Sequence, residues 1–256
     1  MSSQGPSVVA IIPARMGSSR FPGKPLTPIL GLSMLEHVYR RVAMCEMLHA
    51  VYVATCDSEI VQAVQGFGGQ SMMTSPRHER ASDRVAEAAQ RLDADIVVMI
   101  QGDEPMTVPG MIDQAVAPML EDPQVQCVNL VKRIKSEEEY LDPNTIKVAM
   151  DTQGHALYFS REPIPTRRIL GLDRIPRFKQ VCIIPFRRDS LLAYSELKPT
   201  PLEQAESIDM LRLLEHGQQV RLVETEFETH AVDTPEDSIK VEKLMRHDPL
   251  TRQYIT

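Results

Sequence analysis

Three basic side chains follow the first apolar segment of the chain: Arg15, Arg20 and Lys24. Residues 8–12 are all apolar and mostly β-branched, and Pro13 stops them, which predicts a buried strand. The segment after this strand is rich in Gly, Ser and Pro and leads into a helical pattern. Because α/β proteins bind anionic ligands where a strand gives way to a loop and a helix, the three cations indicate a site for phosphate groups.

The spacing of this basic loop separates it from two better known phosphate-binding loops. A P-loop has four residues between its glycines and then Gly-Lys-Ser/Thr. Here five residues separate Gly17 from Gly23, and Pro25 follows Lys24, so no hydroxyl is placed for a metal ion. The GxGxxG pattern of dinucleotide-binding folds is also absent. The loop belongs to neither class, and the alternative that it is an ordinary solvated basic loop stays open.

Two aspartates are candidate acidic partners for the basic loop. Asp103 lies in a Gln-Gly-Asp-Glu-Pro segment that follows residues 95–100, the best candidate for a central strand. Since the carboxyl ends of parallel strands form the ligand crevice, Asp103 should lie near the basic loop; the alternative is an aspartate that caps a helix. Asp233 precedes Thr234 and Pro235, a typical helix start. Its side chain could point into a site or form an ordinary Asx turn.

Cations that hold phosphates and carboxylates that hold a metal ion suit attack on phosphorus. Mg²⁺ takes oxygen ligands, usually one or two carboxylates together with substrate phosphates and water. Asp103 and Asp233 are therefore the candidate Mg²⁺ ligands. No Ser-His-Asp order, cysteine nucleophile motif or flavin motif competes with this interpretation. The residues alone indicate nucleotidyl or phosphoryl transfer.

Strand and helix patterns alternate through the first half of the chain. Further strands are predicted at residues 51–55 and 95–100, and helices after Ser33, over residues 60–67 and over residues 111–120. Repeated alternation of this kind predicts a three-layer αβα fold, with a mostly parallel Rossmann-like sheet and helices on both faces.

The pattern changes in the second half of the chain. Residues 125–134 predict a strand, and residues 145–150 and 155–160 flank a Gly-containing turn typical of a hairpin. Residues 202–216 carry apolar side chains at helical spacing and predict one amphipathic helix. Residues 219–227 predict another strand.

Residues 161–188 reverse the charge of an otherwise acidic chain. They contain several prolines, and eight Arg or Lys against two acidic residues. This composition predicts an irregular basic arm that is solvated, forms a dimer contact, or faces in part an anionic substrate. We interpret residues 7–246 as a single domain, with the hairpin and arm inside residues 151–200, followed by a C-terminal tail at residues 247–256.

Composition argues against several classes of protein. A net charge of −7 disfavours a general nucleic-acid surface, so no nucleic-acid partner is expected. No apolar run reaches membrane-spanning length and the N-terminal residues lack a signal-peptide core, which predicts a cytoplasmic protein without a membrane partner. The four cysteines are widely spaced, with no CxxC pair, and are interpreted as reduced thiols in or near the core.

Five motifs taken together resemble one known family. In chain order they are IPARMGSSRFPGKPL, IQGDEP, DPNTIKVAMD, ALYFSREPIP and VDTPED. This set, in this order over nearly the whole chain, is similar to the 3-deoxy-manno-octulosonate (Kdo) cytidylyltransferases and, more distantly, to the CMP-sialic acid synthetases. The resemblance implies an Mg²⁺-dependent homodimeric enzyme that joins CTP to a small anionic acceptor, a sugar acid, and releases pyrophosphate. It also implies a role in making lipopolysaccharide or another surface glycan.

The resemblance further implies roles for individual residues. The implied catalytic residues are Arg15, Lys24 and Asp103, and Asp103 and Asp233 would bind Mg²⁺. The implied nucleotide-binding residues are Ala14, Arg15, Ser18, Arg20, Lys24, Arg80, Ser82, Arg84, Gln101 and Asp103. The implied acceptor-binding residues are Gln101, Arg161, Arg168, Gln180 and Asp209. Because the basic and acidic groups are both present, a nucleotide-binding protein that has lost catalysis is disfavoured.

Three segments depart from the pattern of the family. Residues 80–82 are Arg-Ala-Ser where the family usually has Ser-Gly-Thr, in a stretch that predicts a helix with its N-cap at residue 82 or 83. Residues 180–186 lack the family's His and first Tyr, and Asp209-Met210 replaces a Glu-Gln pair. Fewer hydrogen-bonding groups would penalise a sugar rich in hydroxyls. The alternative acceptors are a modified Kdo, another sugar acid or a small phosphonate- or phosphate-bearing acid; the other interpretation is drift within the Kdo enzymes.

Overall fold

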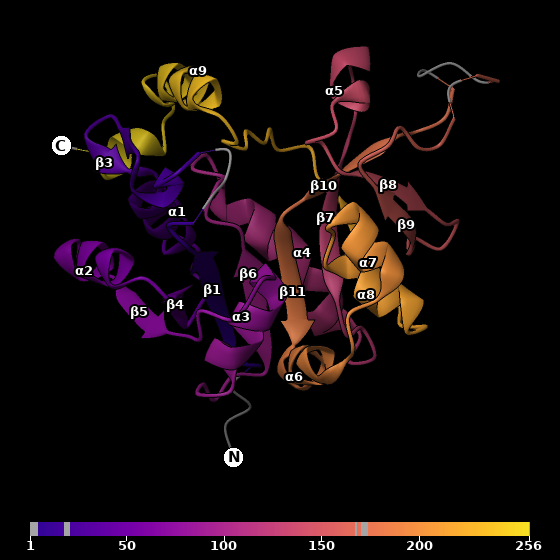
Figure 1. Cartoon of the computed structure of the whole chain (residues 1–256), viewed down its shortest axis with the longest axis horizontal. Coiled ribbons are helices and arrows are strands. Elements are labelled where there is room, and N and C mark those ends of the chain that lie inside the picture. The colour runs from indigo at the N-terminus through magenta and orange to yellow at the C-terminus, as the bar shows by residue number, and fades with distance from the viewer. Residues whose placement is uncertain (1–4, 18–20, 167, 170–173, 256) are drawn as a thin grey trace.

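A five-stranded sheet forms the centre of the molecule (Figure 1). The computed structural model describes residues 5–17, 21–166, 168–169 and 174–255. Across the sheet the strands are β11 (Ile183–Arg187), β6 (Ile96–Ile100), β1 (Val8–Ala14), β4 (Ala50–Thr55) and β5 (Gln70–Met73). β1 is parallel to β4 and β6, β4 is parallel to β5, and only β11 is antiparallel to its neighbour. The prediction of a mostly parallel sheet is confirmed for this part of the chain.

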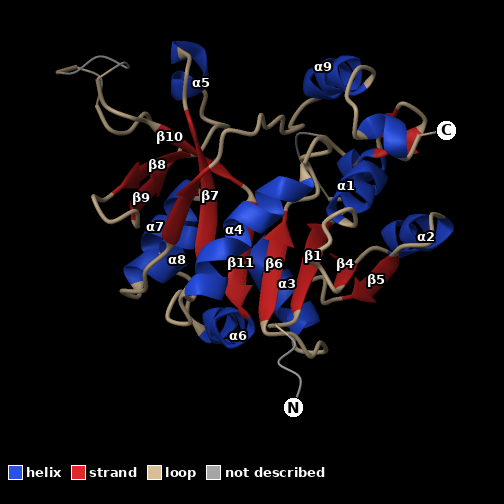
Figure 2. Ribbon diagram, turned by 180° about the vertical axis from the view of Figure 1, so that it is seen from behind, coloured by secondary structure: helices blue, strands red, loops and turns tan. Residues whose placement is uncertain are grey.

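Both faces of this sheet are buried, which explains why its strands are apolar runs rather than alternating patterns. In β1, Val9 and Ile11 pack into one core cluster, whereas Ala10 and Ile12 pack into another. The first cluster includes α3 (Ala81–Ala89) and α6 (Arg188–Glu196), and the second includes α1 (Met34–Val42), α2 (Ser58–Gly66) and α4 (Pro109–Glu121). The helices therefore lie on both faces of the sheet (Figure 2), as the three-layer prediction requires.

A second sheet continues the molecule beyond β11. Its strands, in order, are β12 (Arg221–Glu224), β7 (Val128–Arg133), β10 (Phe178–Val181), β8 (Lys147–Met150) and β9 (Ala156–Ser160). Only the β12–β7 pair is parallel, and the predicted hairpin is the β8–β9 pair. Val131, Val148 and Phe178 of this sheet belong to the same core cluster as Val97 of the first sheet. One continuous core thus joins the two sheets.

The remaining elements are short or lie at the C-terminus. They are the 3-10 helices η1 (Lys24–Leu26) and η2 (Thr251–Gln253), the small hairpin β2 (Pro28–Ile29) and β3 (Leu32–Ser33), and helices α5 (Glu137–Leu141), α7 (Pro201–Glu206), α8 (Met210–Glu215) and α9 (Pro235–Met245). α9 and the C-terminal residues lie beside α1 and the small hairpin (Figure 1). Val241 and Met245 of α9 pack there against Ile29 and Met34.

Three predictions about these elements are wrong. Residues 202–216 form two helices, α7 and α8, because Ser207 takes a left-handed conformation with φ 56° between them. The C-terminal half of the predicted irregular arm contains β10 and β11, whose apolar residues pair with strands far away in sequence. Helix α3 begins two to three residues earlier than predicted, with Arg80 at the N-cap position, so Ser82 lies in its first turn.

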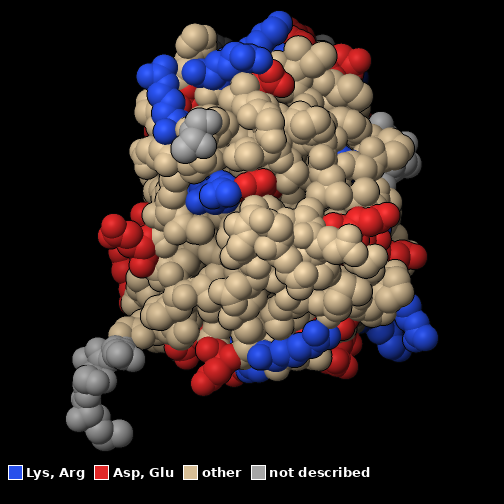
Figure 3. All heavy atoms as spheres, turned by 90° about the vertical axis from the view of Figure 1, so that its left-hand side faces the viewer, with Lys and Arg blue, Asp and Glu red and all other residues tan. Residues whose placement is uncertain are grey.

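Three further features concern membrane-spanning helices, the cysteines and the surface charge. Among the described residues, no helix combines the length and apolar character of a membrane span. All four cysteines are free, and two of them are buried, which confirms the interpretation as reduced thiols in or near the core. On the face that carries α2 and the C-terminus, the described basic side chains form separate groups among acidic ones rather than a continuous band (Figure 3).

Candidate active site

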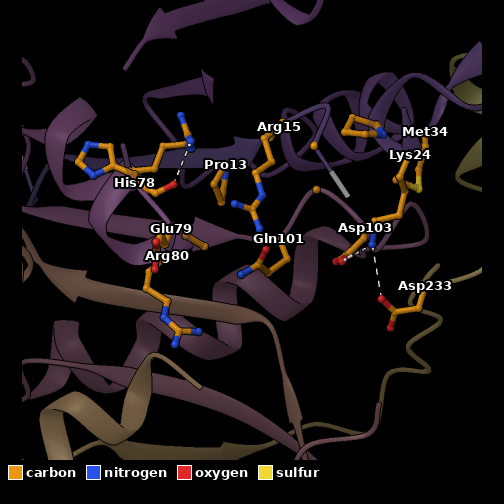
Figure 4. A pocket seen from close by; sticks show the side chains of 16 residues that line it. Pro13, Arg15, Lys24, Met34, His78, Glu79, Arg80, Gln101, Asp103 and Asp233 are labelled. Carbon is orange, nitrogen blue, oxygen red and sulfur yellow. Dashed lines mark hydrogen bonds and ion pairs between the residues drawn. The ribbon is translucent and has the colours of Figure 1, made fainter. Parts of the chain in front are cut away.

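A cavity of about 300 Å³ lies at the carboxyl ends of β1 and β6. It is lined from three sides: by the loop after β1 together with η1, by the start of α3 and the loop before it, and by the loop after β6 together with Asp233 (Figure 4). Gly102 lets two of these segments approach, because a Cβ at this position would lie 3.3 Å from the carbonyl oxygen of Pro13. The ends of β1 and β6 therefore meet where the sequence predicted a ligand crevice.

Lys24 connects the basic loop to both candidate metal ligands. Its Nζ donates to Asp103 Oδ2 at 2.9 Å and to the backbone oxygen of Val232 at 2.9 Å, and lies 3.6 Å from Asp233 Oδ1. The turn that presents Lys24 depends on Gly23, whose φ of 71° favours glycine. The backbone N–H of Val232 donates in turn to the carbonyl oxygen of Asp103 at 2.8 Å. Segments distant in sequence thus form one charged cluster, and Figure 4 shows Lys24 pointing at both carboxylates.

The cluster fits a magnesium ion better than a metal held by protein ligands alone. The described residues contain no group of three His, Cys, Asp or Glu side chains able to hold a metal. Asp103 and Asp233 are both partly exposed, at 28% and 24% of their side-chain surface, and both face the cavity. Two partly exposed carboxylates beside this cavity fit the usual Mg²⁺ arrangement, in which phosphates and water complete the coordination.

The other predicted phosphate-binding residues have different outcomes. Ala14 and Arg15 line the cavity, and the Arg15 guanidinium points toward Gln101 (Figure 4). Ser18 and Arg20 lie outside the described residues, so their positions stay predictions.

Of the predicted base-recognition residues, two line the cavity and one does not. Arg80 and Arg84 line the cavity, but Arg84 is buried and donates to Thr74 Oγ1 at 2.6 Å, which fixes the loop before α3. Ser82 is fully buried and does not line the cavity. Its hydroxyl instead donates to Asp209 Oδ2 at 2.8 Å.

A second cavity of about 250 Å³ adjoins the first. The two share Ala81, Gln101, Asp103 and Asp233 in their lining. Four of the five predicted acceptor-binding residues line the second cavity: Gln101, Arg161, Gln180 and Asp209. Arg168 is exposed and lines neither cavity. Because Asp103 and Asp233 line both cavities, the cluster that they form with Lys24 lies between the two cavities.

The second cavity has a mixed wall. Arg161 is fixed by its Nε–H, which donates to the backbone oxygen of Glu206 at 2.8 Å, and by its backbone N–H, which donates to Glu206 Oε2 at 2.8 Å. Gln180 donates to Asn129 Oδ1 at 2.6 Å. The apolar part of the wall consists of Ala81, Met99, Ile146, Cys182, Ile184, Ile208, Met210 and Ala231. The rest of the wall is polar, and Arg161 is the only basic residue among the described residues that form it, so Arg161 is the candidate partner for an anionic group of a small molecule.

Sequence reasoning missed Glu104, which also lines the second cavity and is almost completely buried. Burial, reinforced by the negative charge of Asp103, raises the pKa of Glu104 to about 7. The only sequence signal was its place next to Asp103 in the segment after β6. Asn144 was also missed: it lies in the DPNTIKVAMD motif, but no role was assigned to it there.

Comparisons with known proteins agree with this geometry. A cytidylyltransferase family model matches residues 9–228. The 3-deoxy-manno-octulosonate cytidylyltransferase of Geobacter metallireducens is 48% identical over 249 residues, which is 93% of this chain and 98% of the relative. The enzyme of the same name from Solibacter usitatus is 45% identical over 239 residues, covering 93% of this chain and 94% of the relative.

Solved structures give the same result. A CMP:2-keto-3-deoxy-manno-octonic acid synthetase complexed with CTP matches with a TM-score of 0.87 and 42% identity, over 94% of this chain and 98% of that one. A 4-diphosphocytidyl-2C-methyl-D-erythritol synthase from Anaerococcus prevotii shares the fold alone, with a TM-score of 0.64 at 15% identity, over 95% of this chain and 97% of that one. The chain therefore belongs to the cytidylyltransferase family, within its 3-deoxy-manno-octulosonate cytidylyltransferase branch.

Proposed function

We propose that the chain transfers CMP from CTP to Kdo or a closely related sugar acid and releases pyrophosphate. The observation that carries this proposal is the Lys24–Asp103–Asp233 cluster, which lies at the junction of two adjoining cavities. A reaction that joins two substrates through phosphorus needs charged groups at such a junction. The names of the relatives, which pair CTP with this sugar acid, support the same assignment.

The proposed roles follow the two cavities. CTP occupies the larger one, with its phosphates held by Arg15, Lys24 and the predicted contacts of Ser18 and Arg20. Arg84 holds the loop that faces the base, and Arg80 lies beside it. The acceptor occupies the smaller cavity, where Arg161 neutralises its carboxylate.

The reaction forms a bond between an acceptor oxygen and the α-phosphorus and breaks the bond from that phosphorus to the pyrophosphate oxygen. Bound Mg²⁺, held by Asp103 and Asp233, would supply positive charge at the phosphates. Lys24 is already within contact of both carboxylates, so a small movement of its amine can follow the charge that develops on the leaving pyrophosphate. The cavity walls hold the two substrates in line, which lowers the entropic cost of their encounter.

A second candidate acceptor is a smaller acid, such as a phosphonate or phosphate-bearing molecule. The observation in its favour is the apolar side of the second cavity, formed in part by Cys182, Ile184 and Met210. This apolar side offers few side-chain hydrogen-bond partners to sugar hydroxyls, although Gln101, Asn144 and Gln180 line the rest of the cavity.

We also propose a homodimer that works in the cytoplasm, where CTP is available, and a product used for lipopolysaccharide or another surface glycan. The segment between β9 and β10, in which Arg168 and Ile169 are exposed, is the proposed dimer contact. Ile169 is 85% exposed, so a partner seated on this segment would bury a large apolar side chain.

A pyrophosphate-release assay tests the reaction. Each of the four nucleoside triphosphates is combined with Kdo, a sialic acid and small phosphonates, with Mg²⁺ present. We expect release with CTP and Kdo alone, and at least a 100-fold loss for Asp103→Asn, because a carboxamide holds Mg²⁺ poorly. Release with CTP and a phosphonate but not with Kdo would establish the second candidate. No release with CTP and any acid would refute the proposed function.

A further inference from the structure

We propose that Ser82 and Asp209 are a positioning pair that couples the two cavities, so that CTP affinity depends on a side chain of the acceptor cavity. The inference rests on the proposed function for the identity of the two ligands. Asp209 lines the acceptor cavity and does not line the nucleotide cavity. Ser82 lines neither, yet it lies between residues that do.

Two short hydrogen bonds join the two residues. Asp209 Oδ2 accepts from the backbone N–H of Ser82 at 3.0 Å and from its hydroxyl at 2.8 Å. Ser82 is completely buried, in the first turn of α3. The N–H groups of a first turn have no partner inside the helix, and a carboxylate there is favoured by the helix dipole. Asp209 therefore fixes the start of α3 from outside the helix.

The start of α3 is also the wall of the nucleotide cavity. Arg80, Ala81 and Arg84 flank Ser82 and all line that cavity. Ala81 lines the acceptor cavity as well. A shift of this turn by a fraction of an ångström would move groups in both spaces at once.

A network of buried charges makes the two sides move together. Arg80 Nη1 donates to Ser207 Oγ at 2.6 Å, which holds the left-handed residue between α7 and α8. Arg212 of α8 contacts Asp83 of α3 at 2.8 Å and Glu203 of α7 at 2.7 Å. Arg212 and Glu203 are almost fully buried and Asp83 is partly buried, so solvent screens these ion pairs less than it screens surface pairs. The break between α7 and α8 is what allows Asp209 to reach Ser82.

Removing the pair should therefore change two affinities. Without the carboxylate, the Ser82 N–H and hydroxyl lose their buried partner, and the first turn of α3 is no longer held. CTP should then bind more weakly even when no acceptor is present. By linkage, if a bound acceptor changes CTP affinity through this contact, bound CTP changes acceptor affinity by the same factor.

The test measures CTP affinity by titration calorimetry without acceptor, in the unaltered chain and in variants. We expect Asp209→Ala and Ser82→Ala to weaken CTP binding by at least about fivefold, and Ser82→Thr, which keeps the hydroxyl, to restore it. Gln180→Ala is the matched control inside the acceptor cavity, since Gln180 bonds to Asn129. It should raise the KM for the acceptor and leave CTP affinity unchanged. Ser190→Ala is the matched serine control, because Ser190 also lies in a first helical turn and donates to another element, Gln126, at 2.6 Å.

The double variant Ser82→Ala/Asp209→Ala completes a double-mutant cycle. We expect its fold loss of CTP affinity to be smaller than the product of the two single fold losses, because each single substitution already removes the same Ser82–Asp209 contact. Equal CTP affinity in Asp209→Ala, Gln180→Ala and the unaltered chain would overturn the coupling while leaving the proposed function intact. If Asp209→Ala does not fold, Ser82→Ala decides alone, since it removes only one hydroxyl. Failure of the unaltered chain to bind CTP would overturn the proposed function and the coupling with it.

Discussion

At the scale of single residues, the site is organised by one amine. Lys24 contacts Asp103, the backbone of residue 232 and Asp233 at the same time, although these segments are distant in sequence. Its side chain is only 15% exposed. A single flexible ammonium can satisfy three acceptors that do not lie in one plane, whereas the donors of a guanidinium are fixed in its plane.

Replacement of Lys24 should therefore be more damaging than loss of one surface charge. We expect Lys24→Met to lower kcat by about 100-fold, because a donor to the developing charge is lost, and Lys24→Arg to restore little of it. Pyrophosphate release measures the effect. Lys240→Met is the control, since Lys240 is 75% exposed on α9. Activity of Lys24→Met within threefold of the unaltered chain would refute the role given to this amine.

At the scale of elements, the sequence predicted those strands and helices that depend on a local pattern. It did not predict features that depend on contacts between residues distant in sequence. The apolar run of β1 predicted its strand, since both faces of that strand are buried. Ser82 was predicted as a helix cap from its type and position, but its partner is Asp209, 127 residues away. No periodicity in residues 202–216 could predict the break at Ser207, which depends on contacts with α3. The same limit hid Asn144, which reaches the acceptor cavity from a loop.

The C-terminal tail is the element whose structural role was hardest to predict from the sequence. Arg41 of α1 is fully buried and donates to Asp248, to Thr251 Oγ1 at 2.7 Å and to the hydroxyl of Tyr254 at 3.1 Å. Another of its N–H groups donates to the backbone oxygen of Thr107 at 3.4 Å, in the loop after β6. The tail thus completes the environment of a buried charge rather than hanging free.

Arg41→Met should destabilise the fold, because it removes one partner of a buried ion pair. We expect a loss of about 3 kcal/mol in the free energy of unfolding, measured by guanidinium titration. The neighbouring Arg40 is the matched control: it is partly exposed and pairs with Glu36 one turn earlier. Arg40→Met should cost less than about 0.5 kcal/mol. Equal losses in the two variants would contradict the assignment of the tail as a structural element.

The same contact predicts a pH dependence. Burial alone would raise the pKa of Asp248, but the hydrogen bonds from Thr251 and the charge of Arg41 outweigh burial and lower it. A lowered pKa in the folded state stabilises the fold above the unfolded pKa and is lost as pH falls through the folded value. Asp248→Asn should therefore be less stable than the unaltered chain at neutral pH, and the difference should shrink below about pH 4. Unfolding titrations across this range measure it; a difference independent of pH would contradict the ionic contribution.

At the scale of the whole molecule, the two sheets form one body with one exposed extension. Residues of both sheets share a core cluster, so neither sheet has a core of its own to keep if the other unfolds. The described part of the segment between β9 and β10 instead runs outward from this body near α5 (Figure 1). It carries Ile169, the most exposed large apolar side chain among the described residues, in a basic stretch of an acidic chain. Complementary charge on a second copy could favour pairing of this segment.

The homodimer prediction is tested at this segment. We expect the chain, of 28.8 kDa, to sediment at about twice that mass. Ile169→Asp should weaken association by at least about tenfold, because it places a charge in the apolar centre of the contact. Ile239→Asp is the matched control, since Ile239 is also exposed, at 59%, but lies on α9. A monomer at all concentrations, or equal weakening by the two substitutions, would exclude this segment as the contact. If Ile169→Asp is a monomer with unchanged CTP affinity, the nucleotide cavity is complete within one chain.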